Sequence, residues 1–412
     1  MAEDFDIAIV GCGIGGGALA TVLARAGVSV LVLEKSTVYR DHVRGEWMAP
    51  WGVVELKTLG LYDTVRAAGG HHLSRHWSCD EDVAPEEAVA TALDLTTLIP
   101  DIGGPLCIGH PQLCQLLIET AAAAGATVRR GVPDVRITLG HSPAIVYQHE
   151  QAEHRVTCRL IVGADGRGSQ VRRDTGLELH RDPTHHLFAG MLVEGADGWP
   201  ADTQAIGAEN DVHFLAFPQG GGRVRLYLGY SSDQPRRLAG AQGPQAFLAA
   251  FRLHSVPGSE HLANARPAGP CNSYPNEDSW TDRPYADGVV LIGDAAGSND
   301  PIIGQGLSIT LRDVRQLRDA LLGTRDWSGA LFASYATERA ERMRRLRFTA
   351  SLISTLENEF GPAGRERRRR ARARQMEDPS LLLPLMAAFI GPENIPAETF
   401  AAQTRERLFG PG

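Results

Sequence analysis

A glycine-rich segment near the N-terminus is the first place where residue types and spacing point to chemistry. Gly11, Gly13 and Gly16 follow the pattern G-x-G-x-x-G, directly after the short apolar run 6–10. Such glycines allow a tight turn, let a phosphate approach the backbone and let a helix pack closely on a strand. The free N–H groups of that helix would then face the phosphates. The pattern predicts a dinucleotide site whose contacts are Gly11, Gly13, Ile14, Gly15 and Gly16.

An acidic residue completes this site. Glu34 closes a second apolar run, residues 28–33. A carboxylate there can accept hydrogen bonds from the ribose hydroxyls of an adenosine, and it disfavours a 2′-phosphate. The bound dinucleotide is therefore expected to be FAD or NAD rather than NADP, with Glu34 and Lys35 among its contacts.

The elements that position these residues follow from the hydrophobic pattern. Residues 6–10 and 28–33 have the pattern of strands, and the apolar spacing over 18–26 predicts a helix between them. The stretch 7–33 is long enough to suggest a membrane segment. Its acidic N-terminal flank, its glycines and Arg25 favour strand, turn and helix instead, so no membrane association is expected.

Composition and charge limit the remaining classes. The chain has 412 residues, 43% hydrophobic and 22% charged, enough to fill the cores of two packed domains. It carries 41 Lys and Arg against 49 Asp and Glu, and this net charge of −8 argues against a nucleic-acid partner. Its six cysteines show no C-x-x-C pair and no zinc spacing. We therefore expect reduced thiols, no metal site and a cytoplasmic protein.

Two later motifs decide between FAD and NAD. Residues 165–172 follow an apolar strand pattern at 160–162 and read D-G-R-G-S-Q-V-R. A second apolar strand pattern, 288–292, runs into Gly293-Asp294, followed by Asp300-Pro301 and Gly304-Gln305-Gly306. With the N-terminal glycines, these segments resemble those of the single-component (class A) flavoprotein monooxygenases, whose FAD fold is of the glutathione-reductase type. The resemblance covers roughly residues 5–345 and selects FAD.

The resemblance also implies roles for individual residues. Asp294 would hold the ribityl chain of FAD, and Asp165 would stabilise the site from behind the pyrophosphate. Arg172 would be the last residue of the motif that Asp165 begins. Arg44 would reach the pyrophosphate or the flavin edge, unless it forms a surface pair with Glu46. His110 would touch FAD, unless it only begins a helix. The remaining expected contacts with the flavin are Pro301, Gly304, Gln305, Gly306 and Leu307.

The chemistry implied by the resemblance is a monooxygenation. NADH or NADPH would reduce the flavin without a second dinucleotide fold, and O2 would form a C4a-hydroperoxide that hydroxylates or epoxidises a small aromatic or secondary-metabolite substrate. The flavin carries such chemistry, so few catalytic side chains are needed. Pro301, His213 and Tyr227 are the candidates. His213 and Tyr227 belong to a wider set expected to line the substrate pocket, with Phe214, Phe217 and Tyr274.

Three other readings stay open at this stage. Gly297 stands where many family members have histidine, and with Asp300-Pro301 this departure favours an FAD-linked reductase or dehydrogenase. A halogenase-like flavoenzyme shares these features. Halogenases need a lysine beside a tunnel, however, and Lys57 lies in a helical pattern that is typical of a solvated side chain. The arginine-rich run 365–374 could belong to an FAD-containing binding protein with a basic tail. We expect instead a helix with its arginines in solvent.

The pattern along the whole chain predicts an α/β protein with a Rossmann-like FAD-binding domain. Its segments are 1–72, 105–178 and 284–345. Segments 73–104 and 179–283 are expected to form a mixed or antiparallel substrate sheet, with strands near 187–193, 212–217 and 224–230. Residues 346–412 are expected to be a helical C-terminal region. A monomer or homodimer is expected.

Overall fold

The computed structural model describes residues 3–43, 45–140 and 142–410. It begins as the pattern predicts, with β1 (Glu3–Val10), α1 (Ile14–Arg25) and β2 (Val30–Glu34). β1 pairs in parallel with β2 and with β11 (Ala152–Gly163), which pairs in parallel with β21 (Val289–Leu291). The three predicted motifs follow β1, β11 and β21, so the parallel register brings them to one edge of the sheet.

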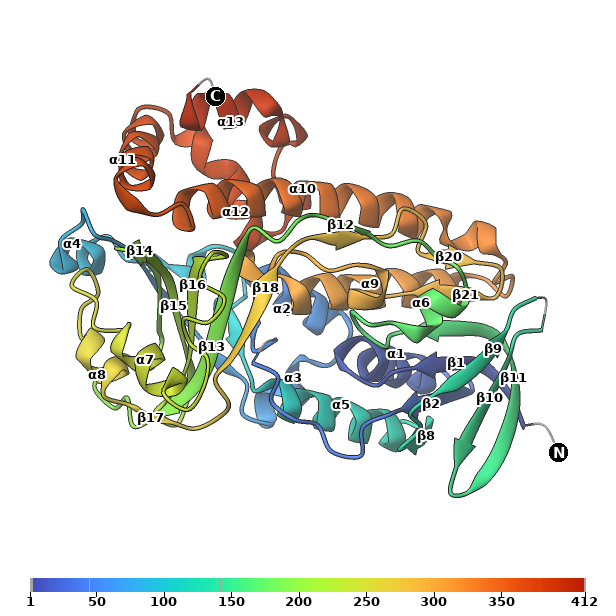
Figure 1. Cartoon of the computed structure of the whole chain (residues 1–412). Helices are drawn as coiled ribbons and strands as arrows, with labels where there is room; N and C mark the ends of the chain where they lie inside the picture. Colours follow the sequence, from blue (N-terminus) through green and yellow to red (C-terminus); the bar gives the residue numbers. More distant parts are fainter. Residues whose placement is uncertain (1–2, 44, 141, 411–412) are drawn as a thin grey trace.

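This first sheet has the order β20-β21-β11-β1-β2-β8, and β10 and β9 extend it from β11. Helices α1, α5 and α9 pack on one face of this sheet, with α1 against both of the others, and β9, β10 and α6 cover the opposite face (Figure 1). The remaining strands and these helices are β8 (Thr127–Arg130), β9 (Val135–Thr138), β10 (Ala144–His149), β20 (Tyr285–Ala286), α5 (His110–Ala123), α6 (Gln170–Asp174) and α9 (Gly306–Gly323).

The second sheet has the order β17-β13-β16-β15-β14-β5-β6, with β18 also paired to β13. Its pairs are antiparallel except the parallel pair β14–β5, so the predicted mixed sheet is confirmed. The strands expected near 212–217 and 224–230 are present and form an antiparallel hairpin. The strands are β5 (Arg75–Asp80), β6 (Leu93–Asp94), β13 (His186–Glu194), β14 (Thr203–Glu209), β15 (Val212–Gly220), β16 (Arg223–Ser231), β17 (Arg266–Pro267) and β18 (Asn272–Asn276).

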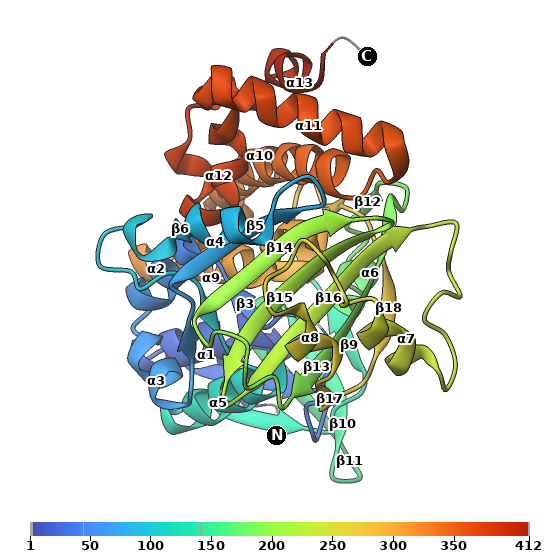
Figure 2. The ribbon, with the colours of Figure 1, turned by 90° about the vertical axis from the view of Figure 1, so that its left-hand side faces the viewer.

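The two faces of the second sheet carry different residues because side chains alternate along each strand. One face packs Phe214 and Leu226 against Phe247 of α7 (Gly243–Ala249), near α8 (Ser259–Ala263). Figure 2 shows α7 and α8 against the sheet. The opposite face carries Leu215, Phe217 and Tyr227 toward the interior between the two sheets.

Short elements connect the two sheets. β3 (Trp47–Met48), β7 (Leu106–Cys107) and β4 (His71–His72) form a small sheet of their own, and β12 (His180–Arg181) pairs with β19 (Ser279–Trp280). The helices of this region are α2 (Pro50–Thr58), α3 (Tyr62–Ala67) and α4 (Pro85–Ala90). Lys57 is exposed near the end of α2, as its pattern indicates.

The C-terminal region is helical, with α10 (Ala333–Glu357), α11 (Gly361–Glu377), α12 (Leu383–Ile390) and α13 (Ala402–Phe409). The predicted boundary between residues 345 and 346 falls inside the unbroken helix α10. The expectation of wholly solvated arginines on α11 is wrong for Arg368, which is 5% exposed. Its Nε lies 2.9 Å from Asp80 Oδ2, so α11 is fixed to β5 by a buried ion pair.

A search of the described helices finds none whose length and apolar character would let it cross a membrane.

Candidate active site

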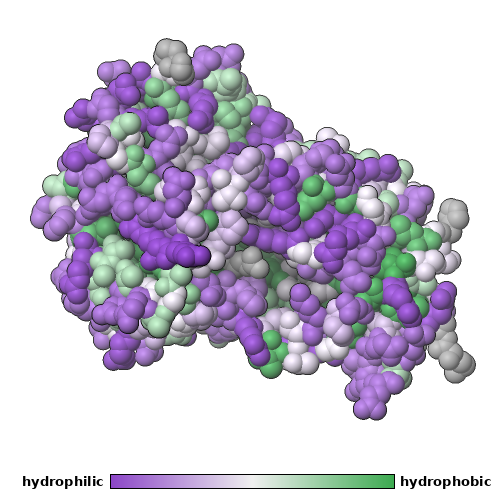
Figure 3. Space-filling model, in the orientation of Figure 1, coloured by the Kyte–Doolittle hydropathy of each residue, from purple (hydrophilic) through white to green (hydrophobic). Residues whose placement is uncertain are grey.

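A single cavity of about 1080 Å³ joins the motif-bearing edge of the first sheet to the inner face of the second. Figure 3 shows the surface hollowed near the middle of the view, between the two parts of the molecule. Every expected cofactor contact except Gly16 and Arg44 lines this cavity. Arg44 lies outside the described residues. Among the described residues no group of His, Cys, Asp and Glu could hold a metal ion.

The glycines of the first motif have separate structural reasons. Gly11 has φ +93°, and a Cβ there would lie 2.6 Å from the carbonyl oxygen of Ala164. A Cβ on Gly16 would lie 1.9 Å from Gly11 O, so Gly16 acts by letting α1 approach β1. A Cβ on Gly13 would meet nothing within 4 Å. The loop is therefore closed toward the protein and open at Gly13, as an approaching pyrophosphate requires.

Glu34 supports this loop from β2. Its Oε2 accepts a hydrogen bond from Cys12 N at 2.6 Å, and its Oε1 accepts one from Ser36 N at 2.7 Å. A carboxylate has about four acceptor positions, so two remain for ribose hydroxyls. Lys35 is exposed and lines the same end of the cavity.

Asp165 stabilises the backbone beside the first motif. Its Oδ2 accepts hydrogen bonds from Gln170 N at 2.7 Å and Val171 N at 3.1 Å, and its Oδ1 accepts one from the Ser169 hydroxyl at 2.5 Å. It therefore holds the N-terminus of α6, in keeping with a position behind the pyrophosphate. Arg172 ties this segment to the next motif by donating to Ala295 O at 2.7 Å.

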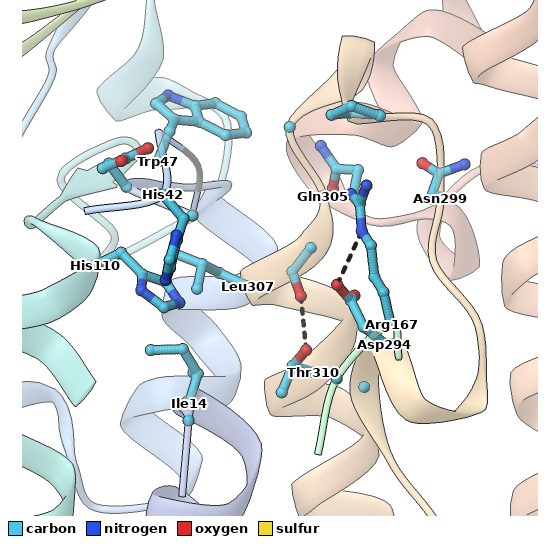
Figure 4. Close-up of a pocket in the computed structure, with 18 of the residues that line it drawn as sticks. Ile14, His42, Trp47, His110, Arg167, Asp294, Asn299, Gln305, Leu307 and Thr310 are labelled. Atoms are coloured by element: carbon cyan, nitrogen blue, oxygen red, sulfur yellow. Dashed lines mark hydrogen bonds and ion pairs between the residues drawn. The ribbon is translucent and has the colours of Figure 1, made fainter. Parts of the chain in front are cut away.

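Asp294 lies at the end of β21, in the turn Gly293–Ala296, and its side chain is about one-third exposed to the cavity. Its Oδ2 accepts from Arg167 Nε at 3.3 Å, as Figure 4 shows. A carboxylate in this position can accept hydrogen bonds from sugar-chain hydroxyls.

A buried ion cluster fixes the backbone around Asp294. Asp313 accepts from Gly293 N at 2.8 Å and pairs with Arg339 and Arg342 of α10. Burial of Asp313 opposes its ionisation, but the two guanidinium groups outweigh it and hold the pKa of Asp313 below its ordinary value. Arg339 also donates to Gly297 O at 3.0 Å. Helix α10, which follows the motif in the sequence, therefore holds the backbone of the motif in place.

The segment 301–307 forms the wall opposite His110 and Trp47 (Figure 4). Pro301–Ile303 is a short 3₁₀ turn, and Gly304, at φ +64°, leads into α9. A Cβ on Gly306 would meet nothing within 4 Å, so the N-terminus of α9 is open to the cavity. Such an N-terminus stabilises negative charge.

The side chain of Gln305 is hydrogen-bonded within the protein. Its Oε1 accepts from Trp51 Nε1 at 2.7 Å and its Nε2 donates to Ala388 O at 2.9 Å, so it ties α2 to α12. Gln305 also lines the cavity, and its contact with the cofactor stays a prediction. Leu307 is 4% exposed and adds an apolar surface to the cavity.

His110 is the first residue of α5 and also lines the cavity, so its contact with FAD stays a prediction that its position allows. Glu46 is not part of a surface pair, because it is 2% exposed. Its Oε2 accepts from the Tyr227 hydroxyl at 2.6 Å, and Arg225 lies 3.1 Å from its Oε1. Burial raises the pKa of Glu46 above its ordinary value.

The three catalytic candidates lie in different surroundings. Pro301 and Tyr227 line the cavity. His213 does not: it is fully buried, and its Nδ1 lies 3.0 Å from Gly207 O. Phe188, which does line the cavity, lies beside His213, with ring centroids 5.8 Å apart. Of the wider set, Phe217 and Tyr274 line the cavity, whereas Phe214 packs in the core on the far face.

Sequence reasoning missed two parts of the site. Trp47 lines the cavity, and α10, α11 and α12 form a wall facing the second sheet. No local signal indicates this wall, because its members are ordinary helix residues. They are Ile353, Leu356, Glu357, Arg368, Ala371, Arg372, Gln375, Leu385, Met386, Ala388 and Phe389.

Comparison with known proteins agrees with this geometry. 3-Demethoxyubiquinol 3-hydroxylase of Escherichia coli strain K12 is 28% identical over 354 residues, which cover 83% of this chain and 85% of that protein. The crystal structure of p-nitrophenol 4-monooxygenase PnpA from Pseudomonas putida DLL-E4 superposes with a TM-score of 0.75 at 20% identity, covering 89% of this chain and 92% of PnpA. The flavin-dependent brominase Bmp2 gives a TM-score of 0.74 at 19% identity, covering 98% of each chain.

These structural similarities show the fold. The FAD binding domain family model matches residues 4–349, most of the chain and all three motifs. The chain therefore belongs to this family, as a flavoprotein of the class A FAD-dependent monooxygenases.

Proposed function

We propose that this protein uses NADH or NADPH and O2 to hydroxylate or epoxidise a small aromatic or secondary-metabolite substrate. One observation carries the proposal: the cavity that holds the three FAD motifs continues, without a dividing wall, beneath the apolar inner face of the second sheet. A substrate there would lie beside the flavin. Bound FAD would accept a hydride from the reduced nicotinamide and pass one oxygen atom of O2 to the substrate, the other leaving as water.

The side chains of the protein hold and shield the reactants. Phe188, Leu215 and Phe217 present an apolar surface to the substrate side, which excludes water from the reacting atoms. The open N-terminus of α9 stabilises the negative charge that a reduced flavin develops. Asp294 would hold the ribityl chain of the cofactor, and the loop at Gly13 would hold its pyrophosphate.

The test begins without oxygen. The purified protein with bound FAD is mixed with NADH or NADPH, and bleaching of the visible flavin band is followed. Reduction is expected, with or without acceleration by candidate aromatic compounds, and it also identifies the preferred nicotinamide. Turnover under ¹⁸O2 should then place one labelled atom in the product.

The outcomes separate the other readings. Turnover without label in the product would refute monooxygenation and indicate a reductase or dehydrogenase. A flavin that neither nicotinamide reduces, with any compound of the panel, would contradict a self-contained enzyme and indicate a partner reductase.

The cofactor site has its own test. Asp294→Ala should lose most of its FAD on gel filtration, measured as the flavin-to-protein absorbance ratio, because the ribityl hydroxyls lose their acceptor. Arg167→Met is the matched control, since it removes the same ion pair but keeps the carboxylate. Full flavin content in Asp294→Ala would exclude this role for Asp294.

A further inference from the structure

A chain of hydrogen bonds runs from Trp47, beside the proposed flavin position, to the edge strand β5. Trp47 Nε1 lies 2.8 Å from Gln204 Oε1, and Gln204 Nε2 lies 3.1 Å from His76 Nδ1. His76 Nε2 lies 3.0 Å from the Ser78 hydroxyl oxygen. Trp47, His76 and Ser78 all line the cavity, while Gln204 is fully buried behind them.

The direction of every hydrogen bond in this chain is determined by its first member. An indole N–H can only donate, so the atom of Gln204 that faces Trp47 must be its oxygen. The amide nitrogen of Gln204 then faces His76, and because it can only donate, Nδ1 of His76 must accept. The proton of a neutral His76 is therefore on Nε2 and is donated to Ser78.

The surroundings keep His76 neutral. It is 9% exposed, and its ring meets Phe389 edge to face with centroids 5.8 Å apart. Burial lowers the pKa of His76 to about 4, well below neutral pH. The nearest acid that acts on it is Glu357 of α10, whose opposing effect is smaller. The Nε2–H tautomer is therefore the one present at neutral pH.

Ser78 is left with a directed donor. One of the two lone pairs of its oxygen accepts the proton from His76, and its own hydroxyl proton has no partner among the residues that the structure describes. The residue is exposed, and the space that it faces belongs to the cavity. Ile206, Leu215, Ile353 and Phe389 form the apolar part of the walls on this side. The charged groups there have partners within the protein: Asp80 pairs with Arg368 and Arg372, and Glu357 Oε2 lies 3.6 Å from His213 Nδ1.

We propose that Ser78 anchors the substrate by donating a hydrogen bond to an acceptor oxygen, a carbonyl or a hydroxyl, on an otherwise apolar aromatic body. The inference rests on the proposed function, because it takes this part of the cavity as the substrate side. Gln204 and His76 are positioning residues: they act on the substrate only by orienting Ser78. The aromatic rings of Phe217 and Phe389 suit a flat substrate.

The test compares two ligands of the same shape in the FAD-bound protein. 1-Tetralone carries a carbonyl where tetralin has a methylene group, and the dissociation constant of each is measured from its perturbation of the visible flavin spectrum. The ratio of the two constants is compared between wild type and Ser78→Ala, so that the different hydrophobicity of the ligands cancels. Ser78→Thr keeps the hydroxyl and serves as the matched control.

In Ser78→Ala the preference for the ketone should fall about three- to tenfold, the worth of one neutral hydrogen bond. Ser78→Thr should keep the wild-type ratio. An unchanged ratio in Ser78→Ala would overturn the proposal, and so would a wild-type protein that binds neither ligand. If the ratio changes but turnover gives no labelled product, the anchor stands and the proposed reaction fails.

The relay has a test that needs no ligand. The ¹⁵N chemical shifts of the His76 ring, assigned by their loss in His76→Gln, should show the proton on Nε2. Gln204→Leu removes the donor to Nδ1, so a second tautomer should appear and the ketone preference should weaken. A proton on Nδ1 in the wild type would contradict the relay.

Discussion

Asp300 offers the clearest prediction for the dependence of stability on pH. It precedes the turn at Pro301 and is 1% exposed. Its Oδ1 accepts from Ile302 N at 2.9 Å and from Asn276 Nδ2 at 3.0 Å, while its Oδ2 is buried without a hydrogen-bond partner in the described structure. Burial raises the pKa of Asp300 from its ordinary value of 3.8 to about 7.

The charged groups around Asp300 do not reverse this effect. Asp278 is also buried and its charge disfavours ionisation of Asp300. His186, whose Nε2 lies 3.8 Å from Oδ1, has its pKa lowered by burial to about 3 and is neutral. His185 lies 3.8 Å from Oδ2 on the exposed side, and Arg167 favours ionisation only weakly.

The sign follows from proton binding. Between about pH 4 and 7 the folded protein holds a proton on Asp300 that the unfolded chain has released, so the free energy of unfolding falls as the pH rises. A pKa difference of about 3 units at about 1.4 kcal/mol each gives an upper bound of about 4 kcal/mol. Relaxation of the protein around a charged Asp300 would make the actual change in unfolding free energy smaller than this bound, so we expect about 2–4 kcal/mol.

Asp300→Asn removes this titration and keeps an acceptor oxygen for Ile302 N. Urea unfolding of both proteins at saturating FAD, from pH 4 to 8, should show the variant gaining about 2–4 kcal/mol on the wild type as the pH rises. Asp174→Asn, at an exposed residue, is the control and should show no such trend. A stability difference between Asp300→Asn and wild type that is constant over this range would refute the reasoning.

Two further predictions concern packing. Gly16→Ala should destabilise the protein even without FAD, by about 2 kcal/mol or more in urea unfolding, since its Cβ would meet Gly11 O. Gly13→Ala should instead keep the stability of the FAD-free protein and weaken FAD binding, measured by titration, and a loss of stability would contradict this contrast. Arg368→Met should cost about 2 kcal/mol or more, because it removes the partner at 2.9 Å from buried Asp80 and leaves it only Arg372, at 3.5 Å. Arg369→Met, at a residue whose side chain is 69% exposed, should stay within about 0.5 kcal/mol, and equal losses would count against the buried ion pair.

The parts of the fold that sequence predicts are those that a local pattern specifies. Gly16 and the strands around it need only their neighbours, because the turn, the helix and the two strands form within residues 3–34. The same holds for the hairpin of β15 and β16, because its two strands are neighbours in the sequence and pair with each other. Both faces of these strands are buried, and an aromatic residue does not indicate which of the two faces it joins, so the expectation that Phe214 lines the pocket is wrong.

The parts that sequence could not predict depend on partners far along the chain. Arg368 pairs with Asp80 across 288 positions, and Trp47 donates to Gln204 across 157. An arginine in a charged run has the local pattern of a solvated residue until a partner buries it. Gln305 shows the same dependence: its place in the motif is local, but the direction of its side chain is set by Trp51 and by α12.

The two walls of the cavity therefore have different sequence requirements. The cofactor wall is built by three strand ends and their glycines, which lie within the family match at residues 4–349. Most of the opposing helical wall, including Phe389 and Arg372, comes after residue 349 and outside that match. A fold whose cofactor wall is constrained by backbone geometry can change its substrate by changing the helices that close the other side. The choice of substrate is therefore expected to reside in β5 and in helices α10 to α12, where the proposed anchor at Ser78 faces them.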